Sequence, residues 1–194
     1  MIAHIKGLIT EKYPTHVVID CNGVGYHLNI SLNTYSKISD KESCKLLTQL
    51  IVREDAHILY GFYEAEEREL FRHLISVSGI GSSTAMMMLS SLSADEIKSA
   101  IVNENVSLIK SIKGIGPKTA QRVILDLKDK FGKVSLKTAE NILSHNTVKE
   151  EALTALVALG FQKNIAEKAI NKAFQDEEGK ARVEEIIKLA LKNL

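Results

Sequence analysis

The stretch KGIGPKTAQRV, residues 113–123, decides how this chain is interpreted. An isoleucine stands between two glycines, and a proline then opens a run with helical spacing. A glycine turn that leads into a helix leaves the first amides of that helix unpaired, and these amides together with the helix dipole attract an anion. The stretch therefore indicates a phosphate-binding turn, and the next question is which phosphate it binds.

Nucleotide-binding loops do not fit this stretch. A Walker loop needs a Gly-Lys-Ser/Thr triplet with a further glycine five residues earlier, whereas Pro117 separates Gly116 from Lys118. A Rossmann fingerprint needs a third glycine where Thr119 stands, and it follows a buried strand rather than a helical segment such as SLIKSIKG. A nucleic-acid backbone, a phosphorylated metabolite and a turn that binds nothing remain as alternatives.

The same stretch occurs twice in the chain. LISVSGIGSSTAMMM (residues 74–88) and IKSIKGIGPKTAQRV (residues 109–123) align without a gap. Internal repeats at such a period predict a repeated supersecondary unit. Each copy is expected to form a helix, a glycine turn whose apolar residue fills the space between helices, and a second helix. This arrangement resembles the helix-hairpin-helix motif, which holds a DNA phosphate through main-chain amides without reading base sequence.

The candidate DNA contacts are the turn glycines and the residues that follow them. The two copies differ in charge, because Ser82 and Ser83 stand where the second copy has Pro117 and Lys118. Together with Arg53 from an earlier turn, the candidates are Gly79, Gly81, Ser82, Ser83, Gly114, Gly116, Lys118, Thr119 and Arg122.

The overall charge of the chain neither supports nor excludes a nucleic-acid partner. The 194 residues have a formal net charge of +1 and are 45% hydrophobic, as in ordinary soluble proteins. The charge is unevenly distributed, however, because residues 108–133 contain seven basic and two acidic residues. This local excess predicts a basic face around the second turn.

No metal or cofactor site is expected. Cys21 and Cys44 lack the spacing of paired ligands, and the six histidines are scattered. The chain shows no signal segment and no run of eighteen apolar residues, which predicts a cytoplasmic protein with free thiols and no membrane contact.

The first 63 residues have the sequence pattern of a small β-barrel. Five short strand-like runs are separated by turn signals, among them Asn22-Gly23, and five strands suit the oligonucleotide-binding (OB) barrel. Residues 64–133 then form the helical domain with both turns, in which Ser93 and Glu96 predict a capping box.

The last third of the chain predicts a separate small module. Residues 134–146 are polar and suggest a flexible linker, and residues 147–194 show three amphipathic stretches that fit a three-helix bundle. Thr147 to Glu150 predict a capping box at the first of these helices. A bundle on a linker suggests docking, with Leu156, Leu159 and Phe161 as candidate contacts. The fold class is therefore α+β and multidomain.

The order of these parts resembles the RuvA family, which binds Holliday junctions in the bacterial branch-migration machinery. The resemblance covers the opening MIAHIKG, the GVGY turn, VREDAHILYGF (residues 52–62), both GIG turns and ALVALGF. It implies a non-catalytic homotetramer, or an octamer on DNA, that holds a four-way junction open. The adjacent acids Glu54 and Asp55 would form its central pin, although acids in a β-turn are often only turn-forming residues.

The resemblance also implies partners. The C-terminal bundle is expected to recruit the RuvB motor ATPase, with the RuvC resolvase in the same recombination and repair pathway. Because Ser83 occupies a position that is basic in some relatives, the first turn is expected to hold DNA mainly through amides.

Two other functions remain open. A base-excision glycosylase also places a Gly-Ile-Gly turn before its catalytic aspartate, but Asp126 and Asp129 follow the turn too closely. A generic structure-selective DNA-binding module is the second alternative.

Overall fold

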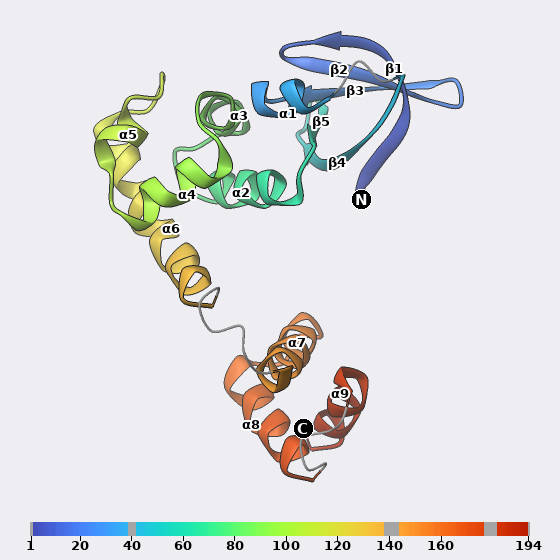
Figure 1. Ribbon diagram of the computed structural model, residues 1–194, viewed down its shortest axis with the longest axis vertical. Coiled ribbons are helices and arrows are strands. Elements are labelled where there is room, and N and C mark those ends of the chain that lie inside the picture. Colours follow the sequence, from blue (N-terminus) through green and yellow to red (C-terminus); the bar gives the residue numbers. More distant parts are fainter. Residues whose placement is uncertain (1, 39–41, 138–143, 177–181, 194) are drawn as a thin grey trace. The chain divides into compact units, whose positions relative to one another are not determined.

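The computed structural model of the chain describes residues 2–38, 42–137, 144–176 and 182–193. Two compact units make up the chain, Met1–Val134 and Ser135–Leu194 (Figure 1). The first unit contains the barrel and the helices of both glycine turns, and the second contains the C-terminal helices.

Five strands close into the expected barrel in the order β1-β2-β3-β5-β4. All neighbouring pairs are antiparallel except β3 and β5, which run parallel. Asn22 and Gly23 both adopt positive φ, 56° and 90°, and so form the predicted hairpin turn. The strands are β1 (His4–Tyr13), β2 (His16–Cys21), β3 (Val24–Ile30), β4 (Ser43–Val52) and β5 (His57–Phe62).

A short helix, α1 (Leu32–Lys37), follows the third strand and was not predicted from the sequence. Its N-cap is Ser31, whose hydroxyl accepts a 2.9 Å hydrogen bond from the Thr34 amide. The helix packs against α3 (Ser82–Ser91) at the edge of the barrel (Figure 1). It therefore connects the barrel to the helical part of the first unit.

The hydrophobic core of the helical part includes two residues of strand β5, while the barrel interior has a core of its own. Tyr60 and Phe62 of β5 each lie 5.0 Å from Phe71 between ring centroids, and all three side chains are buried. The capping box of Ser93 and Glu96 is confirmed. Besides α3, the helices are α2 (Ala65–Ile75), α4 (Ala94–Val102), α5 (Val106–Lys110) and α6 (Pro117–Lys137). Because this core contains residues of β5 and of both glycine turns, it fixes the turns relative to that strand.

The second unit consists of α7 (Ser144–Ala158), α8 (Lys163–Asp176) and α9 (Val183–Lys192) around a core of its own. Gly160 ends α7 with a φ of 98°, and Phe161 N donates a 3.1 Å bond to Leu156 O. Together with the bond from Gly160 N to Val157 O, this is a Schellman motif.

The ends of the expected linker, residues 134–146, differ from the prediction. Helix α6 continues to Lys137 and α7 begins at Ser144, while residues 138–143 lie outside the described part. The capping box predicted at Thr147 was wrong, because the helix begins three residues earlier. Across the described residues, no helix has both the length and the apolar character to cross a membrane.

Candidate nucleic-acid interface

The two glycine turns have the same backbone hydrogen bonds. Ile80 N donates to Val77 O at 3.0 Å, and Ile115 N donates to Ile112 O at 3.1 Å. The bonds that open the following helices also match at 2.9 Å, from Ala85 N to Gly81 O and from Ala120 N to Gly116 O. The sequence repeat is therefore a structural repeat.

The same residues are buried and exposed in both turns. The isoleucine between the glycines is 5% exposed in each copy, at Ile80 and Ile115, and it packs in the core. The flanking glycines are all exposed. In each turn the buried isoleucine therefore anchors the turn in the core, and the glycine backbone faces solvent.

The four glycines have two different roles. Gly79 and Gly114 have φ of 95° and 89°, a conformation that side-chain-bearing residues rarely adopt. Gly81 and Gly116 have no left-handed conformation, and a Cβ added at either would meet no atom within 4 Å. Nothing within the described chain requires glycine at these two positions, whereas the approach of an external backbone would.

The helices after the turns begin with free main-chain donors. Gly81 is the N-cap of α3 and provides no side-chain cap, and α6 begins at Pro117 directly after Gly116. The amides of the first turn of a helix have no acceptor within that helix. At both turns these amides can donate hydrogen bonds to a phosphate oxygen, and the positive end of the dipole adds attraction for its charge.

Within the two repeated segments, residues 74–91 and 109–123, only the second contains cations. Lys118 and Arg122 are exposed, and neither makes an ion pair or hydrogen bond with another described residue. Lys128, further along α6, is paired with Glu104, and this bond raises the pKa of the lysine and lowers that of the glutamate. The unpaired Lys118 and Arg122, on the first turns of α6, are therefore available to a phosphate, and Thr119 lies half-buried between them in the sequence.

The first turn is joined to the barrel through Ser82. Its side chain is buried, and its Oγ accepts a 2.8 Å hydrogen bond from the Tyr60 hydroxyl. Arg53 Nη2 lies 3.4 Å from the same oxygen. The Ser82 hydroxyl is thus occupied inside the protein, which leaves its amide for an external ligand. Ser83, at the position of Lys118, is exposed.

Glu54 and Asp55 lie in the tight turn between β4 and β5. Arg53 N donates a 2.8 Å bond to Ala56 O, which closes the turn, and both acidic side chains are exposed. The structure therefore presents two carboxylates next to Arg53, on the barrel that contacts the first glycine turn.

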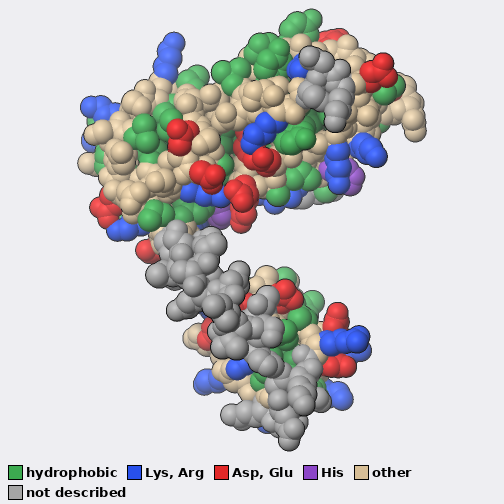
Figure 2. All heavy atoms as spheres, viewed as in Figure 1, with side chains coloured by type: hydrophobic (Ala, Val, Ile, Leu, Met, Phe, Trp, Pro, Cys, Tyr) green, Lys and Arg blue, Asp and Glu red, His purple; other side chains and the backbone are tan. Residues whose placement is uncertain are grey.

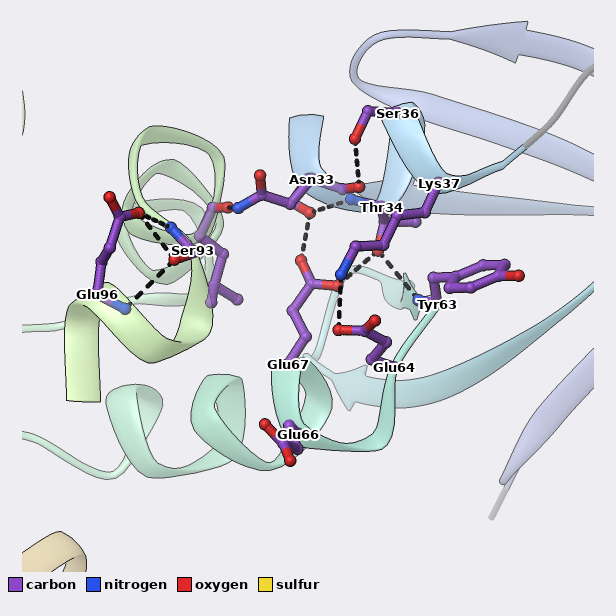
Figure 3. Close-up of polar contacts among 12 residues, drawn as sticks. Asn33, Thr34, Ser36, Lys37, Tyr63, Glu64, Glu66, Glu67, Ser93 and Glu96 are labelled. Carbon is purple, nitrogen blue, oxygen red and sulfur yellow. Dashed lines mark hydrogen bonds and ion pairs between the residues drawn. The ribbon is translucent and has the colours of Figure 1, made fainter. Parts of the chain in front are cut away.

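A buried carboxylate, which was not predicted, connects α1 and α2 (Figure 3). Ser31 Oγ donates to one oxygen of Glu67, and Thr34 Oγ1 donates to the other at 2.6 Å. Burial raises the pKa of Glu67, although the two hydroxyl bonds and nearby Lys37 oppose the shift. In the sequence, Glu67 appeared only as an acid in the first turn of a helix. Such an acid is favoured by the helix dipole, so nothing indicated that its carboxylate is buried.

Asn33 adds a second connection between the barrel and the hairpin helices. Its Nδ2 donates to Leu89 O at 2.6 Å and to Leu92 O at 3.0 Å, at the end of α3. Helix α1 thus contacts α2 through the Glu67 network and the end of α3 through Asn33, while Tyr60 of the barrel contacts the start of α3. The acidic turn and the first glycine turn therefore belong to one body.

The drawn face of the first unit carries charges of both signs, and Figure 2 shows acidic and basic side chains interspersed on it. Within the described residues, no three His, Cys, Asp or Glu side chains gather in a way that could hold a metal ion.

The candidate docking residues of the second unit fall into different environments. Leu156 is fully buried in the core, so its assignment as a surface contact is corrected to a core residue. Phe161 packs against the same core and is partly buried. Leu159 is 62% exposed and remains available to a partner.

A closed five-stranded barrel joined to two glycine-turn repeats defines the class of OB-like proteins with a tandem helix-hairpin-helix domain. Family models match the chain as "RuvA N terminal domain" at residues 1–61, "SAM-like Helix-hairpin-helix tandem" at 71–129 and "RuvA, C-terminal domain" at 147–194. The chain belongs to the RuvA family.

Curated relatives match the chain along its whole length. A protein of Christiangramia forsetii is 56% identical and one of Flavobacterium psychrophilum 54% identical, each over 100% of both chains. A third, from Bacteroides fragilis, is 52% identical over 100% of both chains. All three are named "Holliday junction branch migration complex subunit RuvA".

Proposed function

We propose that the chain binds four-way DNA junctions through their phosphate backbone, without base-sequence specificity, and holds them open. The observation that supports this most directly is the repeated glycine turn. Both copies have the same hydrogen bonds and expose glycines at which a Cβ would meet no atom of the described chain. The relatives that match at full length are named as subunits of a junction branch-migration complex.

A four-fold assembly explains why acids lie on a DNA-binding body. In a homotetramer, which could pair into an octamer on DNA, Glu54 and Asp55 of each subunit would meet at the point where the strands cross. A carboxylate and a phosphate 4 Å apart repel by about 1 kcal/mol in bulk water, and by more where water is partly excluded. The repulsion disfavours a continuous duplex across the centre, whereas an open junction keeps its arms on the glycine turns.

The proposed role of the chain is to present DNA to a motor rather than to catalyse a reaction itself. We propose that the second unit recruits the RuvB ATPase for branch migration, in a recombination and repair pathway that also uses RuvC. The exposed Leu159 and Val157, at the end of α7, provide apolar surface for that contact. A catalytic glycosylase is less well supported, because Asp126 and Asp129 lie exposed on α6 within a few turns of its start.

A gel-shift comparison tests this function. A four-way junction with fixed arms and a linear duplex of the same sequence are titrated with the full chain at two salt concentrations. Preferential binding of the junction is expected, and competition by unrelated junction sequences should be equally effective. Equal affinity for the two DNAs would indicate a generic DNA-binding module instead, and release of a base would indicate a glycosylase.

A further inference from the structure

We propose that Arg53 supplies the cation of the first glycine turn, in place of the lysine that the second turn carries at position 118. The inference rests on the proposed DNA binding and identifies a residue that determines how the first turn engages a phosphate. Arg53 lies on the barrel, outside the sequence of the turn itself.

The first turn lacks a cation of its own. Residues 74–91 contain no lysine, arginine or histidine, whereas residues 109–123 contain Lys110, Lys113, Lys118 and Arg122. Ser83 occupies the position of Lys118, and it is exposed as Lys118 is. Because the two backbones are otherwise alike, a phosphate at the first turn would meet amides and a helix dipole but no charge from that segment.

Arg53 reaches the position where the missing charge would act. Its Nη2 lies 3.4 Å from Oγ of Ser82, the first residue of α3. This distance exceeds the usual 2.7–3.2 Å of an N–H···O hydrogen bond, so the contact is weak and easily exchanged. The side chain is exposed, and the guanidinium has further N–H groups that suit bidentate binding of a phosphate.

The surrounding contacts fix both ends of this arrangement. The bond from Arg53 N to Ala56 O, at 2.8 Å, closes the turn that positions the arginine. The bond from the Tyr60 hydroxyl to Ser82 Oγ, also 2.8 Å, holds the start of α3 against the barrel. Only the arginine side chain would have to become ordered on phosphate binding, which limits the entropic cost.

The position of Arg53 in the chain places a cation that attracts phosphate beside two carboxylates that repel it. It directly precedes Glu54 and Asp55 in one short turn. A phosphate held between Arg53 and the first glycine turn would therefore set the distance of both carboxylates from the same DNA strand. Arg53 would thereby couple the binding of a junction arm at the first glycine turn to the exclusion of a continuous duplex from the junction centre.

The test uses the full chain with the substitutions Arg53→Ala, Arg53→Ala with Ser83→Lys, and Lys118→Ala. Junction affinity is measured over a series of salt concentrations. Each lost phosphate contact should reduce the slope of log affinity against log salt by about one for each bound subunit. We expect Arg53→Ala and Lys118→Ala to reduce both affinity and slope. The double variant has the net charge of the native chain, and its lysine should restore the slope.

Two further variants separate charge from structure. Arg53→Lys should retain most of the slope, and Arg72→Ala, which removes an exposed arginine from α2, should leave it unchanged. Native slope and affinity in a folded Arg53→Ala chain, with Lys118→Ala impaired, would overturn the inference but not the proposed function. If Ser83→Lys fails to restore the slope, the inference is also overturned. Arg53 would then affect binding by shaping the turn and not by supplying a charge. Failure of the native chain to prefer junctions would instead reject the proposed function.

Discussion

The hydroxyl of Tyr60 donates a 2.8 Å hydrogen bond to Ser82 Oγ, and this bond joins the last barrel strand to the first residue of α3. The substitution Tyr60→Phe removes the bond but keeps the ring beside Phe71. We expect a loss of about 1 kcal/mol in the free energy of unfolding, since a buried hydroxyl loses its partner. Urea denaturation measures this loss, with the exposed Tyr63→Phe as the control.

The same variant tests whether the bond positions the interface. We expect Tyr60→Phe to narrow the difference in affinity between junction and duplex, whereas Tyr63→Phe should preserve it. A Tyr60→Phe chain that is less stable but equally selective would show that the bond contributes to folding alone.

The glycines of the second turn allow folding and binding to be separated. At Gly116 a Cβ would meet no atom within 4 Å and the backbone is not left-handed, so Gly116→Ala should change stability by less than about 1 kcal/mol. Junction affinity should nevertheless fall, because the methyl group would meet the approaching phosphate. Gel shifts and thermal unfolding of one preparation provide both measurements.

Gly114→Ala is the matched comparison. Its φ of 89° is strained for alanine, so a loss of about 1 kcal/mol or more in stability is expected. Native junction affinity in Gly116→Ala would remove this glycine from the interface.

Neutralising the acidic turn should alter selectivity more than affinity. In a chain with both Glu54→Gln and Asp55→Asn, affinity for linear duplex should rise more than affinity for junctions, because the repulsion of a central duplex is lost. The effect should shrink as salt is added, since the Debye length falls to about 8 Å near physiological ionic strength.

Glu151→Gln with Glu184→Gln provides the control, because it removes two exposed acids from the second unit. An equal gain in duplex binding in the control would attribute the effect to net charge. If the ratio of junction to duplex affinity stays at its native value, Glu54 and Asp55 are ordinary turn residues.

The buried carboxylate of Glu67 predicts a pH dependence of stability. Burial raises its pKa in the folded chain, so the folded state favours the protonated form. Its contribution is fully present below the ordinary carboxyl pKa of about 4.3 and declines as pH rises through the higher folded value. Glu67→Gln abolishes this titration, so its stability relative to the native chain should increase with pH over that window.

Chemical denaturation between pH 4 and pH 8, covering roughly that window, provides the measurement. Glu151→Gln, which removes an exposed carboxylate from the second unit, provides the control for the loss of one acid. A constant difference between Glu67→Gln and the native chain at all pH values would contradict the prediction.

The division into two units predicts a separation of activities. A chain ending at Val134 retains Phe131, which packs in the core of the first unit. We expect it to bind junctions with nearly native affinity but not to stimulate branch migration by the motor. A chain ending at Lys130 should be less stable, because it lacks Phe131. Full stimulation by the chain ending at Val134 would assign motor docking to the first unit.

The elements that the sequence predicted well are those that local pattern determines. The two glycine turns, the five strands and the Ser93 cap each depend on residues close together in the chain. The six-residue helix α1 was missed because fewer than two turns give no measurable periodicity. Leu156 was misplaced because the same apolar spacing describes a core position and an exposed one.

The contacts that complete the candidate site join distant parts of the chain. Tyr60 and Ser82 are 22 residues apart, and Ser31 and Glu67 are 36 apart. Such pairs depend on how the barrel packs against the helices. The sequence around either residue of a pair does not indicate which residue it will contact. The same reason explains why the proximity of Arg53 to the first turn was found only in the structure.

If both turns bind phosphate as proposed, their recurrence within a single compact unit would make the chain bivalent toward a DNA arm. Once the first turn has bound a phosphate, binding at the second becomes an intramolecular event with a high effective concentration. Because the two turns share a continuous core, this avidity is available only to DNA whose phosphates match their fixed separation. Damage to either turn should therefore cost more affinity than its own contacts provide, and DNA with altered backbone geometry should lose the advantage even when every phosphate is present.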